Sequence, residues 1–223
     1  MNYEEAILLH NKNYFQYYIC LLKYDHPIML SFAPNVDYNS RIIKIFLFFF
    51  LFDLCFNINV LFFNNDIIDK IYEDNGKYNF SYQIPQILYS SLISKFIDSL
   101  IKYSALSQDN IVDLKREKMK KDFDKGFAPK LIRKIKIKFI SFFIITFIVI
   151  VFFLYYITCF CGVYSNTQKH FIIDSVISFF ITLTLPFVTY LIPGLFRFLA
   201  LREENFSRAL LYKLSSFLRK LLR

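Results

Sequence analysis

The run from Phe139 to Phe153 constrains this chain more than any other segment, because its fifteen residues include one Ser, one Thr and no charge. Runs of comparable apolarity occur elsewhere, and hydrophobic residues make up 56% of the sequence. A soluble domain of 223 residues could not bury all of these segments. We therefore predict an all-α integral membrane protein.

Four segments are predicted to cross the bilayer, since a spanning helix needs about 20 mainly apolar residues. They are residues 42–63, 84–106, 139–164 and 171–201. The fourth is long enough to need a tilt or a kink. Pro186 and Pro193–Gly194 can supply the kink, because proline removes a backbone donor from the helix.

The second of these segments, residues 84–106, is amphipathic. One side of the helix carries Ser91, Ser94, Lys95, Asp98 and Lys102. The other side carries Leu92, Ile93, Phe96, Ile97 and Leu100. Such a helix either spans with its polar stripe turned into protein or lies at the interface. The flanking charges favour a span, because residues 64–81 carry four acids and two bases, whereas residues 107–138 carry eleven bases and five acids.

The orientation follows from the same basic segment, because loops rich in Lys and Arg stay on the cytoplasmic side. Lys115–Lys138 alone holds eleven bases and three acids. We predict that the basic loop 107–138 and both termini are cytoplasmic, and that residues 64–81 face outward. The predicted organisation is an N-terminal cytoplasmic segment (1–41), a four-helix membrane domain (42–201) and a basic amphipathic tail (202–223).

The tail is predicted to form an amphipathic helix at the membrane surface. Its apolar arc consists of Leu210, Leu211, Leu214, Phe217, Leu218, Leu221 and Leu222. Its basic arc, the predicted contact with anionic lipid headgroups, consists of Arg208, Lys213, Arg219, Lys220 and Arg223. Because the basic segments adjoin spans, lipid is a nearer partner than nucleic acid. The alternatives are packing in a groove of another protein and binding to calmodulin.

Polar residues inside the spans form the candidate site, because hydrocarbon tolerates them only when they are partnered. Asp53 and Lys95 lie at similar depth on antiparallel neighbouring helices, which predicts an ion pair between them. Asp98, three residues after Lys95, is the competing or additional partner. The complete predicted seam is Asp53, Asn57, Ser91, Ser94, Lys95 and Asp98. Its functional interpretation is an aqueous or ion-conducting path, and its structural interpretation is a buried pair that locks the helices together.

Other reactive groups are sparse. His170 and Asp174 lie one turn apart near the outer end of the fourth span, where we expect both to be hydrated. Cys159 and Cys161 point to different faces of a helix, and no further Cys or His stands at metal-ligand spacing. The sequence contains no phosphate-binding loop, no nucleophile elbow and no H-E-x-x-H motif. We therefore predict no catalytic residue, no cofactor and no metal.

Four short segments carry a resemblance to known proteins. They are Tyr24-Asp25-His26-Pro27, Ile71-Tyr72-Glu73-Asp74, Gln83-Ile84-Pro85-Gln86-Ile87-Leu88-Tyr89-Ser90 and Cys159-Phe160-Cys161-Gly162-Val163-Tyr164-Ser165-Asn166-Thr167-Gln168. From about residue 20 onward, the chain resembles the C-terminal multi-pass membrane module of large protist surface proteins, especially those of ciliates with long repeat-rich ectodomains. The resemblance implies a surface membrane and carries no assigned activity. In those proteins a further span precedes the module, so we expect this chain to be a shortened or free-standing relative.

Two functions follow from these observations. The first is a non-enzymatic membrane module that anchors or assembles a larger surface complex, alone or as an oligomer. The alternative is a channel or transporter subunit whose polar seam lies on the first two spans. Whether Lys95 and Asp98 face water separates the two.

Overall fold

The structure, a computed structural model, describes residues 13–34, 37–108, 110–112, 115, 127–202 and 208–222. Over these residues every regular element is a helix, which confirms the all-α prediction at that level. The chain divides into two compact units, with the boundary between Thr182 and Leu183. We call the part between residues 36 and 182 the larger unit and the remainder the smaller unit.

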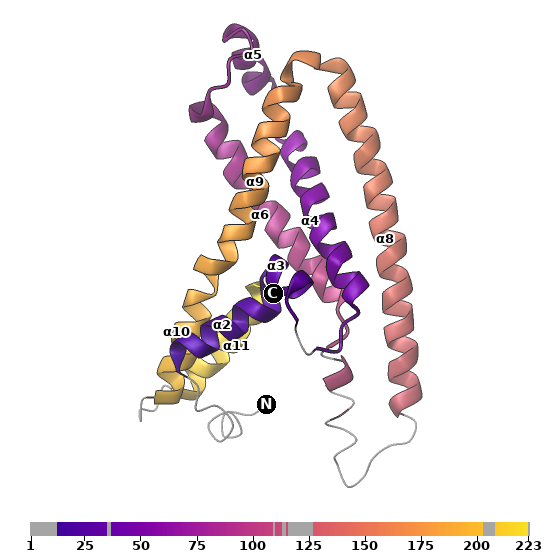
Figure 1. Cartoon of the computed structure of the whole chain (residues 1–223), viewed down its shortest axis with the longest axis vertical. Helices are drawn as coiled ribbons and strands as arrows, with labels where there is room; N and C mark the ends of the chain where they lie inside the picture. Colours follow the sequence, from indigo (N-terminus) through magenta and orange to yellow (C-terminus); the bar gives the residue numbers. More distant parts are fainter. Residues whose placement is uncertain are drawn as a thin grey trace. The chain divides into compact units, whose positions relative to one another are not determined.

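The larger unit contains the first three predicted spans and the beginning of the fourth (Figure 1). Its helices are α4 (Arg41–Leu61), α5 (Asn65–Glu73), α6 (Phe80–Ala105), α8 (Phe127–Val163), η1 (Ser165–Thr167) and the first two thirds of α9 (Gln168–Thr189). Helix α4 packs against α6, and α8 contacts both.

Three segments are long and apolar enough to cross a membrane: Arg41–Leu61, Pro129–Val163 and Ser165–Ala200. They correspond to the first, third and fourth predicted spans. Helix α6, the second, has 26 residues but is not among the three. Its serines and three charges make it more polar than the others, and its burial pattern, described below, gives those groups a protein environment.

Helix α8 is the most exposed of the three apolar helices. Only 11% of its most apolar stretch is buried, although that stretch is rich in large side chains such as Phe147, Phe152 and Leu154. A surface of this kind is stable against lipid and not against water. The exposed apolar face of α8 is therefore compatible with membrane insertion.

Helix α8 also begins earlier than predicted. It starts at Phe127, so residues 127–138 of the predicted basic loop are helical. Pro129 lies in the first turn, where a missing backbone N–H does no harm. Near the end of this basic part, Lys138 Nζ donates to the Leu106 carbonyl oxygen at 2.7 Å and so satisfies the terminus of α6.

The fourth predicted span is broken, as its prolines suggested. Helix α9 ends at Thr189, Tyr190 forms a turn and α10 (Leu191–Arg202) follows. Pro193 has no N–H to donate to the carbonyl of Thr189, four residues earlier, so one hydrogen bond of the ladder is missing, and the ladder resumes where the Gly194 N–H donates to the Tyr190 carbonyl at 3.2 Å. The interruption at Tyr190 lies between Pro186 and Pro193, the residues that were predicted to supply a kink.

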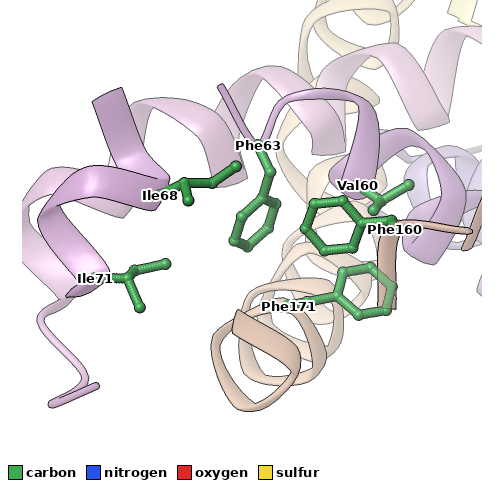
Figure 2. Close-up of a cluster of buried hydrophobic side chains, with 6 residues drawn as sticks. All are labelled: Val60, Phe63, Ile68, Ile71, Phe160 and Phe171. Carbon is green, nitrogen blue, oxygen red and sulfur yellow. The ribbon is translucent and has the colours of Figure 1, made fainter. Parts of the chain in front are cut away.

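An apolar cluster closes one end of the larger unit, and Figure 2 shows its six buried side chains. They are Val60, Phe63, Ile68, Ile71, Phe160 and Phe171. Val60 lies in α4, and Phe63 follows shortly after the end of that helix. Ile68 and Ile71 lie in α5, Phe160 in α8 and Phe171 in α9. Helix α5 forms because the Asn64 side chain accepts from the Ile67 N–H at 3.0 Å, a regular N-cap. The predicted outer loop 64–81 is therefore a structured lid, which we call the cap.

The smaller unit contains α2 (Tyr14–Asp25), α3 (Pro27–Phe32), the end of α9, α10 and α11 (Arg208–Leu222). Arg197 of α10 lies over the ring of Tyr17 at 4.6 Å and that of Tyr212 at 5.2 Å. Ser215 donates to the Pro193 carbonyl at 2.8 Å. Parts of the predicted N-terminal segment and of the predicted tail thus pack on α10.

Candidate functional site

Helix α6 has the reverse of the amphipathicity seen in water-soluble helices. Its buried residues are mainly polar: Gln83, Gln86, Ser90, Ser91, Ser94, Asp98 and Lys102. Its exposed large side chains are apolar or aromatic: Phe80, Ile84, Leu88, Tyr89, Leu92, Ile93, Phe96, Leu100 and Tyr103. The predicted separation into a polar and an apolar side is therefore confirmed, with the polar side turned into protein.

The centre of the buried face is a knot of hydroxyl groups between α6 and α9. Ser178 Oγ lies 2.9 Å from Ser90 Oγ and 3.0 Å from Ser91 Oγ. One turn later, Thr182 donates to the Ser91 carbonyl at 3.3 Å. Cys55 of α4 reaches the Thr182 hydroxyl at 3.7 Å. Small hydroxyl residues allow close approach of helices and bond across them, as in membrane helix packing.

Asn59 joins three helices one turn away from this knot. Its Nδ2 donates to Ser175 Oγ of α9 at 3.2 Å, and its Oδ1 accepts from Gln86 Nε2 of α6 at 3.2 Å. Asn59 and Ser175 are fully buried. Together with the hydroxyl knot, this contact defines a polar seam through α4, α6 and α9, which we call the seam.

At one end of the seam two lysines share a single carboxylate. Lys102 Nζ lies 2.8 Å from Asp98 Oδ2, and Lys95 Nζ lies 3.4 Å from the same oxygen. The side chain of Asp98 is 1% exposed, whereas that of Lys95 is 14% exposed. Asp98, which was predicted as the competing or additional partner of Lys95, is thus the partner that the structure shows.

The structure does not favour the first predicted partner, Asp53. Asp53 is half-buried, and its Oδ2 has no hydrogen-bond partner among the described residues. Asn57 Nδ2 donates to the backbone carbonyl of Asp53 at 2.7 Å, so Asn57 bonds within its own helix. The face of α4 that bonds to the seam carries Cys55 and Asn59 instead, because these two residues lie one turn apart on a different side of the helix.

Several seam residues were not predicted, namely Cys55, Asn59, Gln86, Ser90 and Ser175. A signal for part of this set does exist in the sequence. Ser175, Ser178 and Thr182 recur at spacings of three and four on an otherwise apolar helix, and Gln86, Ser90 and Ser94 recur at spacings of four on α6. Comparing the two stripes would have indicated that α6 pairs with α9 as well as with α4.

At the other end of the seam lie Asp174 and His170, both fully buried. The expectation that they are hydrated is wrong, because residues between α5 and α6 cover them. Tyr78 from that segment donates to Asp174 Oδ1 at 2.8 Å, and His170 Nε2 lies 3.3 Å from the Lys77 carbonyl oxygen. Desolvation, together with the hydrogen bond to Asp174 and its charge, raises the pKa of Tyr78 well above its ordinary value.

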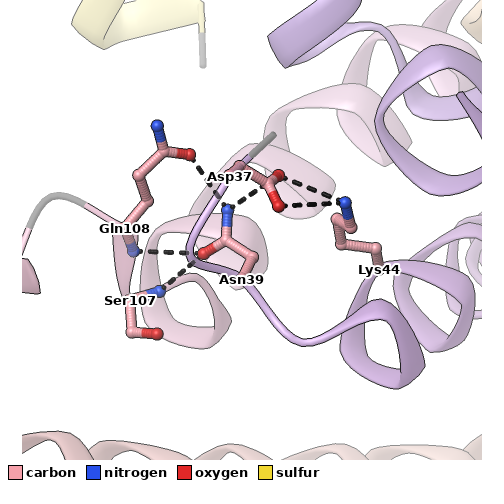
Figure 3. Close-up of polar contacts among 5 residues, drawn as sticks. All are labelled: Asp37, Asn39, Lys44, Ser107 and Gln108. Atoms are coloured by element: carbon pink, nitrogen blue, oxygen red, sulfur yellow. Dashed lines mark hydrogen bonds and ion pairs between the residues drawn. The ribbon is translucent and has the colours of Figure 1, made fainter. Parts of the chain in front are cut away.

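A second polar cluster, shown in Figure 3, holds the start of α4 to the end of α6. Asn39 Oδ1 accepts from the backbone N–H groups of Ser107 and Gln108, both at 3.1 Å. Lys44 Nζ forms an ion pair with Asp37 Oδ1 at 3.1 Å. This clamp fixes the register of α4 against α6, which the seam requires.

The predicted headgroup contacts are described only in part. Lys213 is exposed on α11, and the side chains of Arg208, Arg219, Lys220 and Arg223 lie outside the described residues. The apolar arc of α11 is divided in two. Leu210, Leu214 and Phe217 are exposed, whereas the side around Ser215 packs on α10.

No metal-binding group of three or more His, Cys, Asp or Glu residues occurs in the described part of the chain. The four cysteines are free thiols. The chain matches no protein-family model, no curated protein and no solved structure. The geometry of the seam is thus the basis for a functional interpretation.

Proposed function

We propose that this chain is a non-enzymatic multi-pass membrane module that anchors or assembles a larger surface complex. In this proposal the seam is the adhesive that holds the spans in one arrangement. The observation that carries it is the reversed amphipathicity of α6, whose buried side includes Gln86, Ser90, Ser91, Asp98 and Lys102, which bond to α4, to α9 or to one another.

The proposal includes four spans, with α6 as the second. A helix of 26 residues is about 39 Å long and exceeds a hydrocarbon core of about 30 Å. Its exposed side presents large apolar groups along most of its length, which suits lipid. Its charges are partnered inside protein, and this lowers the cost of placing them in a bilayer.

The proposed orientation has both termini and the basic segment on the cytoplasmic side and the cap outside. The exposed bases Lys130, Arg133, Lys134 and Lys136 occupy the first turns of α8, directly before its apolar part. Bases in this position attract anionic headgroups of the cytoplasmic leaflet. The tail adds Lys213 and further bases to that contact. The resemblance to protist surface modules supports a surface membrane.

A channel or transporter subunit is the second candidate, and one observation favours it. Several seam-level polar atoms are buried without a hydrogen-bond partner among the described residues, including Asn57 Oδ1, Asp98 Oδ1 and Asp174 Oδ2. Buried polar atoms of this kind are often satisfied by water or an ion. Oligomer formation could place such atoms along a path.

Accessibility of the α6 stripe tests the two candidates. In a background where Cys20, Cys55, Cys159 and Cys161 are replaced, single cysteines are introduced at Ser91, Ser94, Lys95 and Asp98. A membrane-impermeant thiol reagent is then applied to intact cells and to permeabilised cells. Protection of all four positions in both preparations is expected for an adhesive seam.

Leu92→Cys and Lys77→Cys serve as controls. Leu92 lies on the exposed apolar side of α6 and is expected to be protected by lipid, whereas Lys77 is exposed in the cap and is expected to react in intact cells. Labelling along the whole stripe at a rate comparable with Lys77→Cys would overturn the adhesive role and support conduction.

A further inference from the structure

The end of the seam beneath the cap contains an isolated buried carboxylate. Asp174 is fully buried, and Tyr78 donates to its Oδ1 at 2.8 Å. Its Oδ2 has no hydrogen-bond partner among the described residues, and none of the ion pairs found there involves Asp174. A charged carboxylate in such a position requires a compensating positive charge.

Further polar groups without partners lie on the adjoining turns of α6. Gln83 is fully buried, and neither Oε1 nor Nε2 of its amide has a partner among the described residues. Gln86 is 4% exposed, and its Oε1 is likewise unpartnered. The hydroxyl of Tyr82 is a third such group.

Two hydrogen bonds link Gln86 to the turn of α9 that carries Asp174. Gln86 bonds to Asn59, and Asn59 bonds to Ser175, the residue after Asp174. Gln83 lies one turn before Gln86 on the same buried face. Tyr82 lies in the first turn of α6, directly before Gln83.

We propose that Asp174, Gln83 and Gln86 form a buried site for one monovalent metal cation of the Na⁺ type. A single carboxylate balances one positive charge, and amide oxygens are neutral ligands suited to a hard cation. A divalent ion would call for more carboxylates than this end of the seam provides.

A metal cation fits the unpartnered oxygens better than a proton does. A proton on Asp174 Oδ2 can be donated to one acceptor, whereas at least two amide oxygens, those of Gln83 and Gln86, lie unpartnered at this level. In the proposed site the cation is coordinated by these amide oxygens and the carboxylate together. The titratable groups around Asp174 are Tyr78 from the cap, Tyr82 from the first turn of α6 and His170 one turn earlier on α9, with Asp74 of the cap near Tyr82.

Thermal unfolding of the full chain in detergent tests the site. NaCl is titrated against choline chloride at constant ionic strength and constant pH. Because a ligand that binds only the folded state stabilises it, Na⁺ at about ten times its dissociation constant is expected to raise Tm by about 3–6 °C, saturably. Asp174→Asn retains the shape of the side chain and is expected to abolish the Na⁺-dependent shift.

Asp69→Asn is the matched control, since Asp69 is exposed on α5 and is expected to leave the shift unchanged. If Asp174→Asn does not fold, Gln83→Leu and direct binding of ²²Na⁺ to the wild-type chain replace it. We expect Gln83→Leu to weaken Na⁺ binding about tenfold, the loss of one ligand bond.

Three results would overturn the proposal. They are equal Tm values in Na⁺ and choline, a full Na⁺ shift in folded Asp174→Asn, and stabilisation by acid alone that Asp174→Asn removes, which would make a proton the occupant. A shift with K⁺ as large as with Na⁺ still supports a monovalent cation site. The outcome is independent of the adhesive role of the seam, which the cysteine labelling tests separately.

Discussion

The buried carboxylate of Asp98 pairs with both Lys95 and Lys102. Replacing Asp98 is therefore expected to change the stability by a different amount from replacing one of the lysines. Removing Asp98 leaves Lys102, 4% exposed, with a buried charge that has lost its partner. Removing Lys102 leaves Asp98 paired with Lys95. Breaking a buried pair costs more than replacing one of several partners, because the uncompensated charge remains desolvated.

We therefore expect Asp98→Leu to destabilise the chain by about 3–5 kcal/mol, a fall in Tm of roughly 6–20 °C. Lys102→Met is expected to lower the stability by only a small part of that amount. The methionine side chain fills the space of the lysine methylenes, and Asp98 keeps Lys95 as a partner. Thermal unfolding in detergent measures both, with exposed Asp69→Asn as the control. Equal losses for Asp98→Leu and Lys102→Met would contradict the shared-carboxylate geometry.

Individual residues also show where prediction from sequence ended. The stripe of Ser91, Ser94, Asp98 and Lys102 was identified because helical spacing places them on one side. The sequence left two partners for Lys95. Asp98 is near it by spacing along the same helix, which the sequence gives directly, whereas Asp53 is near it only if the depths of two helices in the membrane have been estimated correctly. Asn59 and Cys55 were missed, since a single polar residue in an apolar helix does not indicate which neighbour it faces.

At the scale of the helix, two glycines offer a matched comparison. Gly162 lies in α8, and nothing is found within 4 Å of where a Cβ would stand. Gly194 lies in α10, and a Cβ there would meet the Tyr14 ring at 3.3 Å. Both have helical backbones, so the packing of Tyr14 is the main difference between them.

We expect Gly162→Ala to raise stability by about 0.5–1 kcal/mol, because alanine is the better helix former. Gly194→Ala is expected to gain less or to lose stability, since the Tyr14 ring must move. Thermal unfolding of the two variants beside the wild type measures the difference. A larger gain at Gly194 than at Gly162 would show that α10 and α2 are not packed as described.

Helix boundaries were predicted with mixed accuracy, for identifiable reasons. The start of α4 at Arg41 and the break near Tyr190 followed from charge and proline. The early start of α8 at Phe127 was not expected, because a basic segment was taken to be a loop although Lys and Arg are good helix formers. The lid formed by α5 was missed because its two buried isoleucines depend on contacts with Phe63 and Phe171.

At the scale of the whole molecule, the placement of α6 decides the number of membrane crossings. In the four-span proposal the cap and the start of α8 lie on opposite sides of the membrane. If α6 lay at the interface, both would be on the same side. Single-cysteine labelling in intact cells distinguishes these topologies directly.

We expect Lys77→Cys in the Cys-free background to react with an impermeant thiol reagent in intact cells. Lys134→Cys, exposed near the start of α8, is expected to react only after permeabilisation. Residues 107–138 are richer in Lys and Arg than residues 64–81, so the segment that contains Lys134 is predicted to be the cytoplasmic one. Reaction of both positions in intact cells would contradict the crossing by α6, and protection of both until permeabilisation would contradict it as well.

The sequence by itself determined the helical class, the three apolar segments and the two sides of α6, because composition and the 3.6-residue period are local properties. It also indicated the break after α9, since proline acts on its own turn. Only the tertiary structure decided that the polar side of α6 faces α4 and α9, that Asp98 rather than Asp53 pairs with Lys95, and that Asp174 lies buried beneath the cap. Those features depend on which helices meet and at what register, and residues far apart in the chain set both.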